Sequence, residues 1–101
     1  MASIVETLVA DLERGAALLD RHGVNPHWAS LLRGYAARLE KGDRGAAADL
    51  LKQFGGMGSF NDGVISPLNG HRVEEDQIDV VNNQLNDLRE RLYAGAHDLA
   101  S

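Results

Sequence analysis

The sequence predicts an all-α fold, with four helices in one compact domain and a glycine-rich loop crossing over between the third and the fourth. Apolar residues recur at three- and four-residue steps along most of the chain, which is the spacing that places side chains on one face of a helix. A glycine ends each of the first three periodic stretches. A chain of 101 residues, 44% of them hydrophobic, is long enough for one core, so a single domain over residues 1–101 is expected.

The first helix is predicted over residues 3–22. Ser3 and Glu6 form the S-x-x-E pattern of a capping box, in which the side chains of the first turn satisfy free backbone N–H groups. Gly23 can adopt the left-handed conformation that closes a helix. Gly15, inside the helix, costs about 1 kcal/mol relative to alanine, so we expect another helix to pack closely against it.

The second helix is predicted over residues 26–41. Asn25 supplies a side-chain cap, and the proline that follows it suits the first helical position because its missing N–H is not needed there. Gly42 ends the helix. Gly34, inside it, leads to the same expectation of close helix packing as Gly15.

The third helix is shorter and is predicted over residues 44–54, with Asp43 as its cap. The fourth is predicted over residues 74–94, with acidic residues in its first turns and arginines in its last, as the helix dipole favours. Its apolar residues step by three and four positions in a heptad-like pattern: Ile78, Val81, Leu85, Leu88 and Leu92. Such a seam must be buried against the other helices or against a second copy.

The crossover loop is predicted over residues 55–73, and the sequence FGGMGSFNDGVISPLNGH occupies residues 54–71. It lacks the side chains of the common glycine motifs. A dinucleotide-binding G-x-G-x-x-G needs a glycine where Asn61 stands, and a phosphate-binding P-loop needs Lys and Ser or Thr where Val64-Ile65 stands. A calcium loop loses most of its ligands as well.

Two turn sequences remain in the loop, Asn61-Asp62-Gly63 and Ser66–Gly70. Between and after them, Val64-Ile65 and His71–Val73 can pair as a very short β-hairpin. A connection of this length either folds under its own side chains or serves a ligand. We favour the first reading, in which the polar groups of the loop satisfy one another.

The alternative is a small anionic or polar ligand held by the loop, and its candidate binding residues are Ser59, Asn61, Asp62 and His71. Ser59 with His71 and Asp62 is also the only set that the sequence brings together for nucleophilic catalysis, but no strained strand-to-helix turn accompanies it. We therefore predict no catalytic residue and favour a non-enzymatic role. His71 and Glu75 are four positions apart, but no second close histidine completes a metal site, so neither a metal nor a cofactor is expected.

The charge pattern restricts the classes of partner that the chain is expected to bind. The net charge of −5 argues against nucleic acid, which requires clustered Lys and Arg. Residues 1–50 hold seven acids and six bases, and residues 51–101 hold eight acids and four bases, so the halves carry −1 and −4. An electrostatic partner should therefore be basic and should meet the second half. No apolar stretch is long enough to span a membrane, and the absence of cysteine and of a basic leader favours a cytoplasmic protein.

The run GGMGSFND, followed by VISPLNGH and a helix that ends in LRERLY, resembles a family of small bacterial proteins whose function is unassigned, a domain of unknown function. The likeness covers roughly residues 50–93. It implies that the loop and the last helix fold as one unit, and it implies no activity, substrate or partner. Gly63 departs from the bulky apolar residue usual there. The signature residues are Gly55, Gly56, Gly58, Asn61, Asp62, Asn69, Gly70 and His71.

Together these features predict a cytoplasmic, non-catalytic interaction or regulatory protein that associates with itself or with another protein. Self-association is expected through the fourth helix or the face that carries Trp28. One alternative is an immunity-type inhibitor that covers a basic toxin, and another is a ligand-binding or enzymatic protein that uses the loop. The candidate interface residues are Trp28, Tyr35, Leu85, Leu88 and Leu92.

Overall fold

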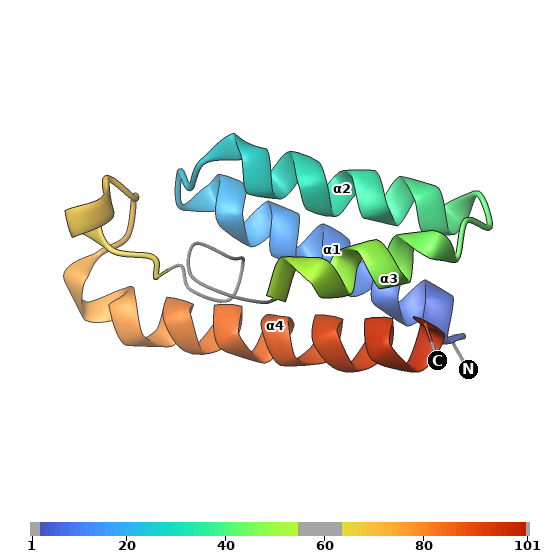
Figure 1. Ribbon diagram of the computed structural model, residues 1–101. Helices are drawn as coiled ribbons and strands as arrows, with labels where there is room; N and C mark the ends of the chain where they lie inside the picture. The colour runs from blue at the N-terminus through green and yellow to red at the C-terminus, as the bar shows by residue number, and fades with distance from the viewer. Residues whose placement is uncertain (1–2, 55–63, 101) are drawn as a thin grey trace.

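The computed structural model describes residues 3–54 and 64–100 and confirms an all-α fold with four helices (Figure 1). Within these described residues, three short 3-10 turns accompany the helices: η1 (Lys52–Phe54), η3 (Pro67–Asn69) and η4 (Glu75–Gln77). The four helices are α1 (Ile4–Arg21), α2 (Pro26–Glu40), α3 (Gly45–Leu51) and α4 (Ile78–Ala100).

The helix ends follow the local signals in the sequence. The Ser3 hydroxyl accepts the Glu6 N–H at 3.1 Å, as in the predicted capping box. The Asn25 side chain accepts the His27 N–H at 3.0 Å and so caps α2. Gly23 and Gly42 close α1 and α2 with φ of +66° and +86°, in the left-handed region that favours glycine.

The helices form a bundle around one hydrophobic core. α1 packs along α2 and also against α4, while α3 packs mainly against α4 (Figure 1). The predicted seam of α4 faces this core, with Val81, Leu85 and Leu92 buried. α1 begins and α4 ends at the same end of the molecule, and residues 64–77 lie at the opposite end (Figure 1).

The glycines inside α1 and α2, Gly15 and Gly34, differ in how closely a neighbouring helix packs against them. A Cβ atom added at Gly15 would lie 3.1 Å from Leu32 Cδ1 of α2, which confirms close helix packing at this position. At Gly34, no atom lies within 4 Å of the added Cβ, so the same expectation is wrong there. Periodicity identifies helical glycines but does not tell which of them face a neighbour.

Two predictions about the second half need correction. Residues 64–73 contain no strand, so the β-hairpin is wrong: Ile65 bonds to the Asn82 side chain and Arg72 bonds to His22, and neither strand can form. The fourth helix begins at Ile78, after η4, and runs to Ala100, not from residue 74 to 94. Its apolar spacing continues past Leu92, which extends its buried face.

Candidate functional site

Residues 64–80, which we call the tip segment, lie against the turn between α1 and α2 and lead into α4 (Figure 1). The segment contains the whole described part of the predicted loop, residues 64–73. Its attachments to the bundle are hydrogen bonds to residues far away in the sequence, and they fix what it buries and what it exposes.

Asn82 of α4 fixes the beginning of the tip segment. Its side-chain amide accepts the Ile65 N–H at 2.8 Å and donates to the Ile65 carbonyl at 2.8 Å. It also donates to the Ile78 carbonyl at 2.8 Å. Ile65 is only 1% exposed, so one neutral amide satisfies backbone groups that would otherwise be buried without partners.

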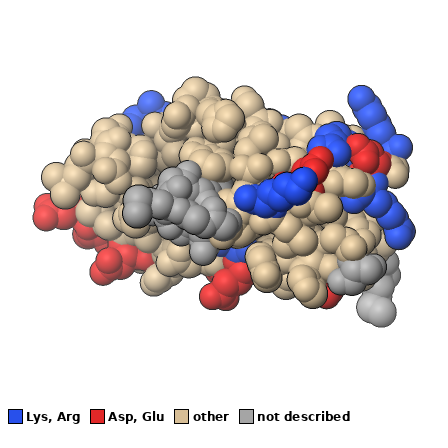
Figure 2. All heavy atoms as spheres, in the orientation of Figure 1, with Lys and Arg blue, Asp and Glu red and all other residues tan. Residues whose placement is uncertain are grey.

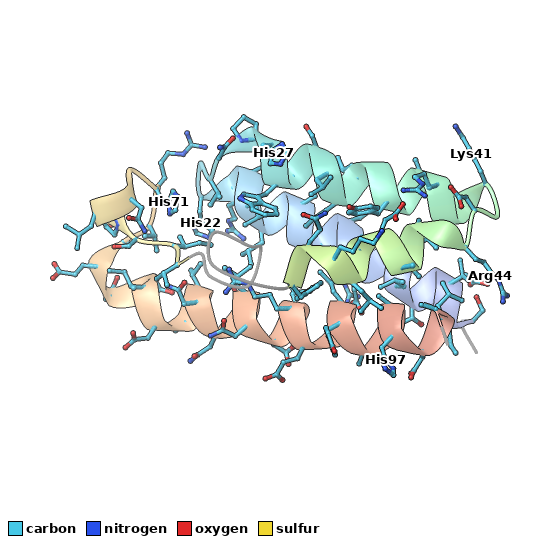
Figure 3. The ribbon with its side chains drawn as sticks, in the orientation of Figure 1. His22, His27, Lys41, Arg44, His71 and His97 are labelled. Atoms are coloured by element: carbon cyan, nitrogen blue, oxygen red, sulfur yellow. The ribbon has the colours of Figure 1, made fainter. Side chains whose placement is uncertain are left out.

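His22 and Arg72 join the tip segment to the turn after α1, although they are 50 residues apart. The Arg72 N–H donates to the His22 carbonyl at 2.6 Å, and His22 Nδ1 lies 2.6 Å from the Arg72 carbonyl. Since a carbonyl only accepts, Nδ1 carries the proton in this contact. The Arg72 guanidinium also donates to the Asp20 carbonyl at 3.3 Å. His22 and His71 lie near each other at this end (Figure 3).

Residues 66–71 form a compact turn around η3. The Ser66 carbonyl accepts the N–H groups of Asn69 and His71 at 3.0 and 3.2 Å, and the Ser66 N–H donates to His71 Nδ1 at 3.2 Å. The Asn69 side chain donates to the Val64 carbonyl at 2.9 Å. These bonds hold Leu68 at the apex of the turn, where its side chain is 96% exposed.

Four exposed carboxylates follow this turn, at the start of α4: Glu74, Glu75, Asp76 and Asp79. Within residues 3–54 and 64–100, none of the four forms an ion pair. Figure 2 shows acidic atoms gathered along the lower left, where α4 begins, and basic atoms gathered toward the right. The tip segment therefore combines negative charge with an exposed leucine.

A cavity of about 240 Å³ lies behind the tip segment, between it and the helices. Arg89 of α4, only 7% exposed, forms part of its wall and donates to the Asn86 side chain at 3.1 Å. The other polar side chains of the wall come from Asn25, Asn69 and His71. The apolar part of the wall comes from Leu19, Val24, Trp28, Val64, Ile65 and Leu85.

The candidate ligand residues Ser59, Asn61 and Asp62 lie outside the described residues, as do the glycines before them. His71 is half-buried at the cavity wall, and its Nδ1 bonds to the tip segment's own backbone. No group of three or more potential metal-binding His, Asp or Glu side chains occurs in the described part of the chain.

The candidate interface residues are largely internal. Leu85 and Leu92 are 2% and 0% exposed within one chain, so they are not available to a second copy. Tyr35 is buried, and its hydroxyl accepts a hydrogen bond from Gln53 at 3.1 Å. Trp28 and Leu88 are half-buried.

At the opposite end of α2, Arg38 joins two carboxylates. Its Nε donates to Asp43 at 2.8 Å and its Nη1 lies 2.9 Å from Asp49. The hydrogen bonds to Asp43 and then Asp49 raise the pKa of Arg38, and the hydrogen bond from Arg38 lowers the pKa of Asp49. Lys52 Nζ also lies 3.6 Å from Asp49, so two basic groups face two carboxylates and the charges of this cluster offset one another.

Three residues of the tip segment and of the neighbouring part of α4 were not identified from the sequence. Leu68 sits in a turn sequence whose polar residues gave no sign of its exposure. Asn82 adjoins the buried Val81, and a polar residue beside a seam is a weak signal. Arg89 follows Leu85 by four positions and precedes Leu92 by three, so a helical wheel places it next to the buried face.

None of the described helices is both long and apolar enough to cross a membrane. Comparison with protein-family models matched residues 21–74, more than half of the chain, to a family described as "Domain of unknown function (DUF6966)". The match takes in α2, α3 and most of the tip segment, and it lies further toward the N-terminus than the expected residues 50–93. Searches of curated proteins and of solved structures found no match. The chain therefore belongs to the DUF6966 family.

Proposed function

We propose that this chain is a non-catalytic interaction protein that binds a basic protein partner through the tip segment. The observation that carries the proposal is Leu68, whose side chain is 96% exposed on a turn fixed by hydrogen bonds. Interfaces gain much of their affinity from a few apolar anchors held in position before binding.

The exposed apolar side chains are concentrated in the tip segment. Among the described residues, three of the five large hydrophobic side chains that are exposed belong to it: Val64, Leu68 and Val80. Single exposed hydrophobic residues are ordinary on protein surfaces. Their concentration in 17 residues that also carry a network of fixing hydrogen bonds supports a contact surface.

The charge of the tip segment favours a basic partner. Glu74, Glu75, Asp76 and Asp79 are exposed, and an opposing surface rich in Lys and Arg would be attracted to them and guided into register. Two tip segments facing each other would bring like charges together, which disfavours self-association at this surface. An immunity-type inhibitor of a basic toxin is one protein of the proposed kind.

The first test selects binders from a displayed library of random peptides against the whole chain. We expect enriched peptides to combine Lys or Arg with an aliphatic or aromatic residue. Leu68→Ser should weaken their binding about tenfold or more and leave the free energy of unfolding within about 0.5 kcal/mol. Ile4→Ser is the matched control, because Ile4 is also exposed but lies at the other end. Peptides that bind Leu68→Ser as tightly as the unmodified chain would contradict the proposal.

The second test separates local charge from net charge. The triple variant Glu74→Gln, Glu75→Gln, Asp76→Asn should slow association and reduce its salt dependence. The control variant Glu13→Gln, Glu90→Gln, Asp98→Asn removes three exposed carboxylates elsewhere, so it changes net charge equally. Equal effects of the two variants would exclude a specific role of the tip segment. Sedimentation of the free chain should show a monomer, and a dimer dissociated by Leu68→Ser would favour self-association instead.

A further inference from the structure

We propose that Asn69 is a site of spontaneous deamidation, and that the folded tip segment controls the reaction by holding this residue in an unreactive conformation. Asn69 precedes Gly70, and this is the only Asn-Gly pair in the chain. Asparagine is a thermally labile residue, and a following glycine has no Cβ to hinder attack by its backbone nitrogen. The modification does not depend on a protein partner.

Deamidation at this pair needs only water and a base. The Gly70 backbone nitrogen loses its proton to hydroxide and bonds to the Asn69 side-chain carbon Cγ, and the side-chain nitrogen leaves as ammonia. Water then opens the resulting succinimide at either of its carbonyls, which gives aspartate or isoaspartate. Both residues are exposed, so water reaches the reacting atoms. One amide and one water become a carboxylate and an ammonium ion, and the chain gains one negative charge.

The folded turn opposes this reaction in three ways. Asn69 lies in η3, and the ψ of a 3-10 residue, about −20 to −30°, directs the next nitrogen away from the residue's own side chain. The Gly70 N–H donates to the Pro67 carbonyl at 3.0 Å, and this bond must break before the nitrogen can lose its proton. The Asn69 amide donates to the Val64 carbonyl at 2.9 Å, which holds it against rotation. The reaction therefore proceeds from an open form of the turn.

The attachment of the tip segment to α4 sets the population of this open form. Asn82 bonds to both backbone groups of Ile65 at 2.8 Å, and Val64, which accepts the Asn69 amide, directly precedes Ile65. Release of Ile65 would therefore also free the acceptor that holds the Asn69 side chain. Segments open locally at a free energy set by such contacts, so the deamidation rate of the native chain should report how firmly Asn82 holds the tip segment.

The product alters the turn permanently. A carboxylate at position 69 cannot donate to the Val64 carbonyl, and isoaspartate lengthens the main chain by one carbon at the turn that holds Leu68. If the contact surface acts as proposed above, deamidation adds a negative charge beside Leu68 and loosens the turn that presents it. This consequence rests on the proposed function, whereas the reaction and its control by the fold do not.

The first test incubates the whole chain at mildly alkaline pH, in native buffer and in guanidinium chloride, and follows conversion of Asn69 by peptide mapping with mass spectrometry. We expect deamidation in guanidinium chloride, and a rate at least about tenfold lower in the native chain. Because this comparison uses the unmodified chain, it does not depend on any variant folding. Equal rates in the two conditions, or no conversion in guanidinium chloride, would overturn the proposal.

Variants then test the control by the tip segment. Asn82→Ala should accelerate the native reaction at Asn69 at least about tenfold, while Asn83→Ala, its exposed neighbour, should leave the rate unchanged. Ser66→Ala removes the hydroxyl that accepts the Leu68 N–H at 3.2 Å and leaves α4 intact, so it should give about a twofold to threefold acceleration in a folded chain. Native rates that match the unmodified chain in both Asn82→Ala and Ser66→Ala would overturn the proposal. Since no partner is present in either test, the result is independent of the proposed function.

Discussion

The two ends of the molecule use their charged groups differently. At the end where α2 meets α3, Arg38 bonds to Asp43 and lies within 2.9 Å of Asp49, and Lys52 lies 3.6 Å from Asp49, so the four charges offset one another. At the tip segment, four carboxylates are exposed without an ion pair to any described residue. The first end pairs the charges of this cluster within the chain. The second leaves charge and apolar surface that a partner can use.

The two ends are also held by different forces. Exposed charge pairs of the Arg38 kind contribute little to stability and weaken in salt. The tip segment is attached mainly by hydrogen bonds between neutral groups, above all those between Asn82 and the buried Ile65, together with one from the Arg72 guanidinium to the Asp20 carbonyl. The main attachment of the tip segment should therefore depend little on ionic strength, which leaves its carboxylates available for binding.

The largest expected effect concerns this attachment. Asn82→Ala removes three hydrogen bonds and leaves the Ile65 N–H and carbonyl buried without a partner, so it should destabilise the fold by about 3 kcal/mol. Urea denaturation measures the loss, and hydrogen exchange at Ile65 should accelerate. Asn83→Ala changes an exposed neighbour and should cost less than about 0.5 kcal/mol. Similar losses for both variants would refute the importance of this attachment.

A smaller effect on stability is expected from glycine-to-alanine substitutions, which we compare at Gly34, near the Arg38 end, and at Gly15 in the core. Gly34→Ala adds a methyl group to open space and should stabilise the chain by up to about 1 kcal/mol. Gly15→Ala places its methyl 3.1 Å from the buried Leu32, and this crowding offsets the gain. Thermal unfolding should rank Gly34→Ala above Gly15→Ala by at least about 1 kcal/mol. A reversed order would mean that the two helix faces have been assigned wrongly.

The smallest effect is a pH dependence at the Arg38 end. The hydrogen bond from Arg38 holds the pKa of Asp49 below its ordinary value of 3.8, so the folded state binds this proton more weakly than the unfolded state. The resulting stability is present above about pH 4 and is lost as the pH falls through the folded-state pKa. Asp49→Asn should be less stable than the unmodified chain at pH 7, and the difference should narrow at pH 3. Glu13→Gln should show no such narrowing, and an equal change in both variants would exclude a specific Arg38–Asp49 contribution.

The sequence predicted what depends on neighbours along the chain. The Ser3 cap, the Asn25 cap and the positive φ of Gly23 each involve residues within three positions of one another. The tip segment depends on contacts between residues 17 and 50 positions apart, and periodicity carries no information about such pairs. This is why a hairpin was expected where Asn82 and His22 instead satisfy the backbone.

The candidate site was predicted only in part for the same physical reason. His71 was identified as a polar group of the loop that bonds to its own backbone, and Trp28 as a residue of core or interface. Arg89 was missed because charged side chains are rarely buried, so composition argues against placing one in a cavity wall. Leu68 was missed because an apolar residue is expected inside until the structure shows the turn that holds it out.

The placement of the start of α1 and the end of α4 has a practical consequence for measuring binding. α1 begins and α4 ends side by side, with Ile4 and Asp98 lining one hollow, at the end away from η3, which contains Leu68 (Figure 1). A fluorescent label, a purification handle or a sensor surface linked to either terminus would therefore leave Leu68 facing the solution. Two such domains joined in tandem would present their leucines in opposite or parallel directions according to the linker, which offers a simple route to bivalent probes.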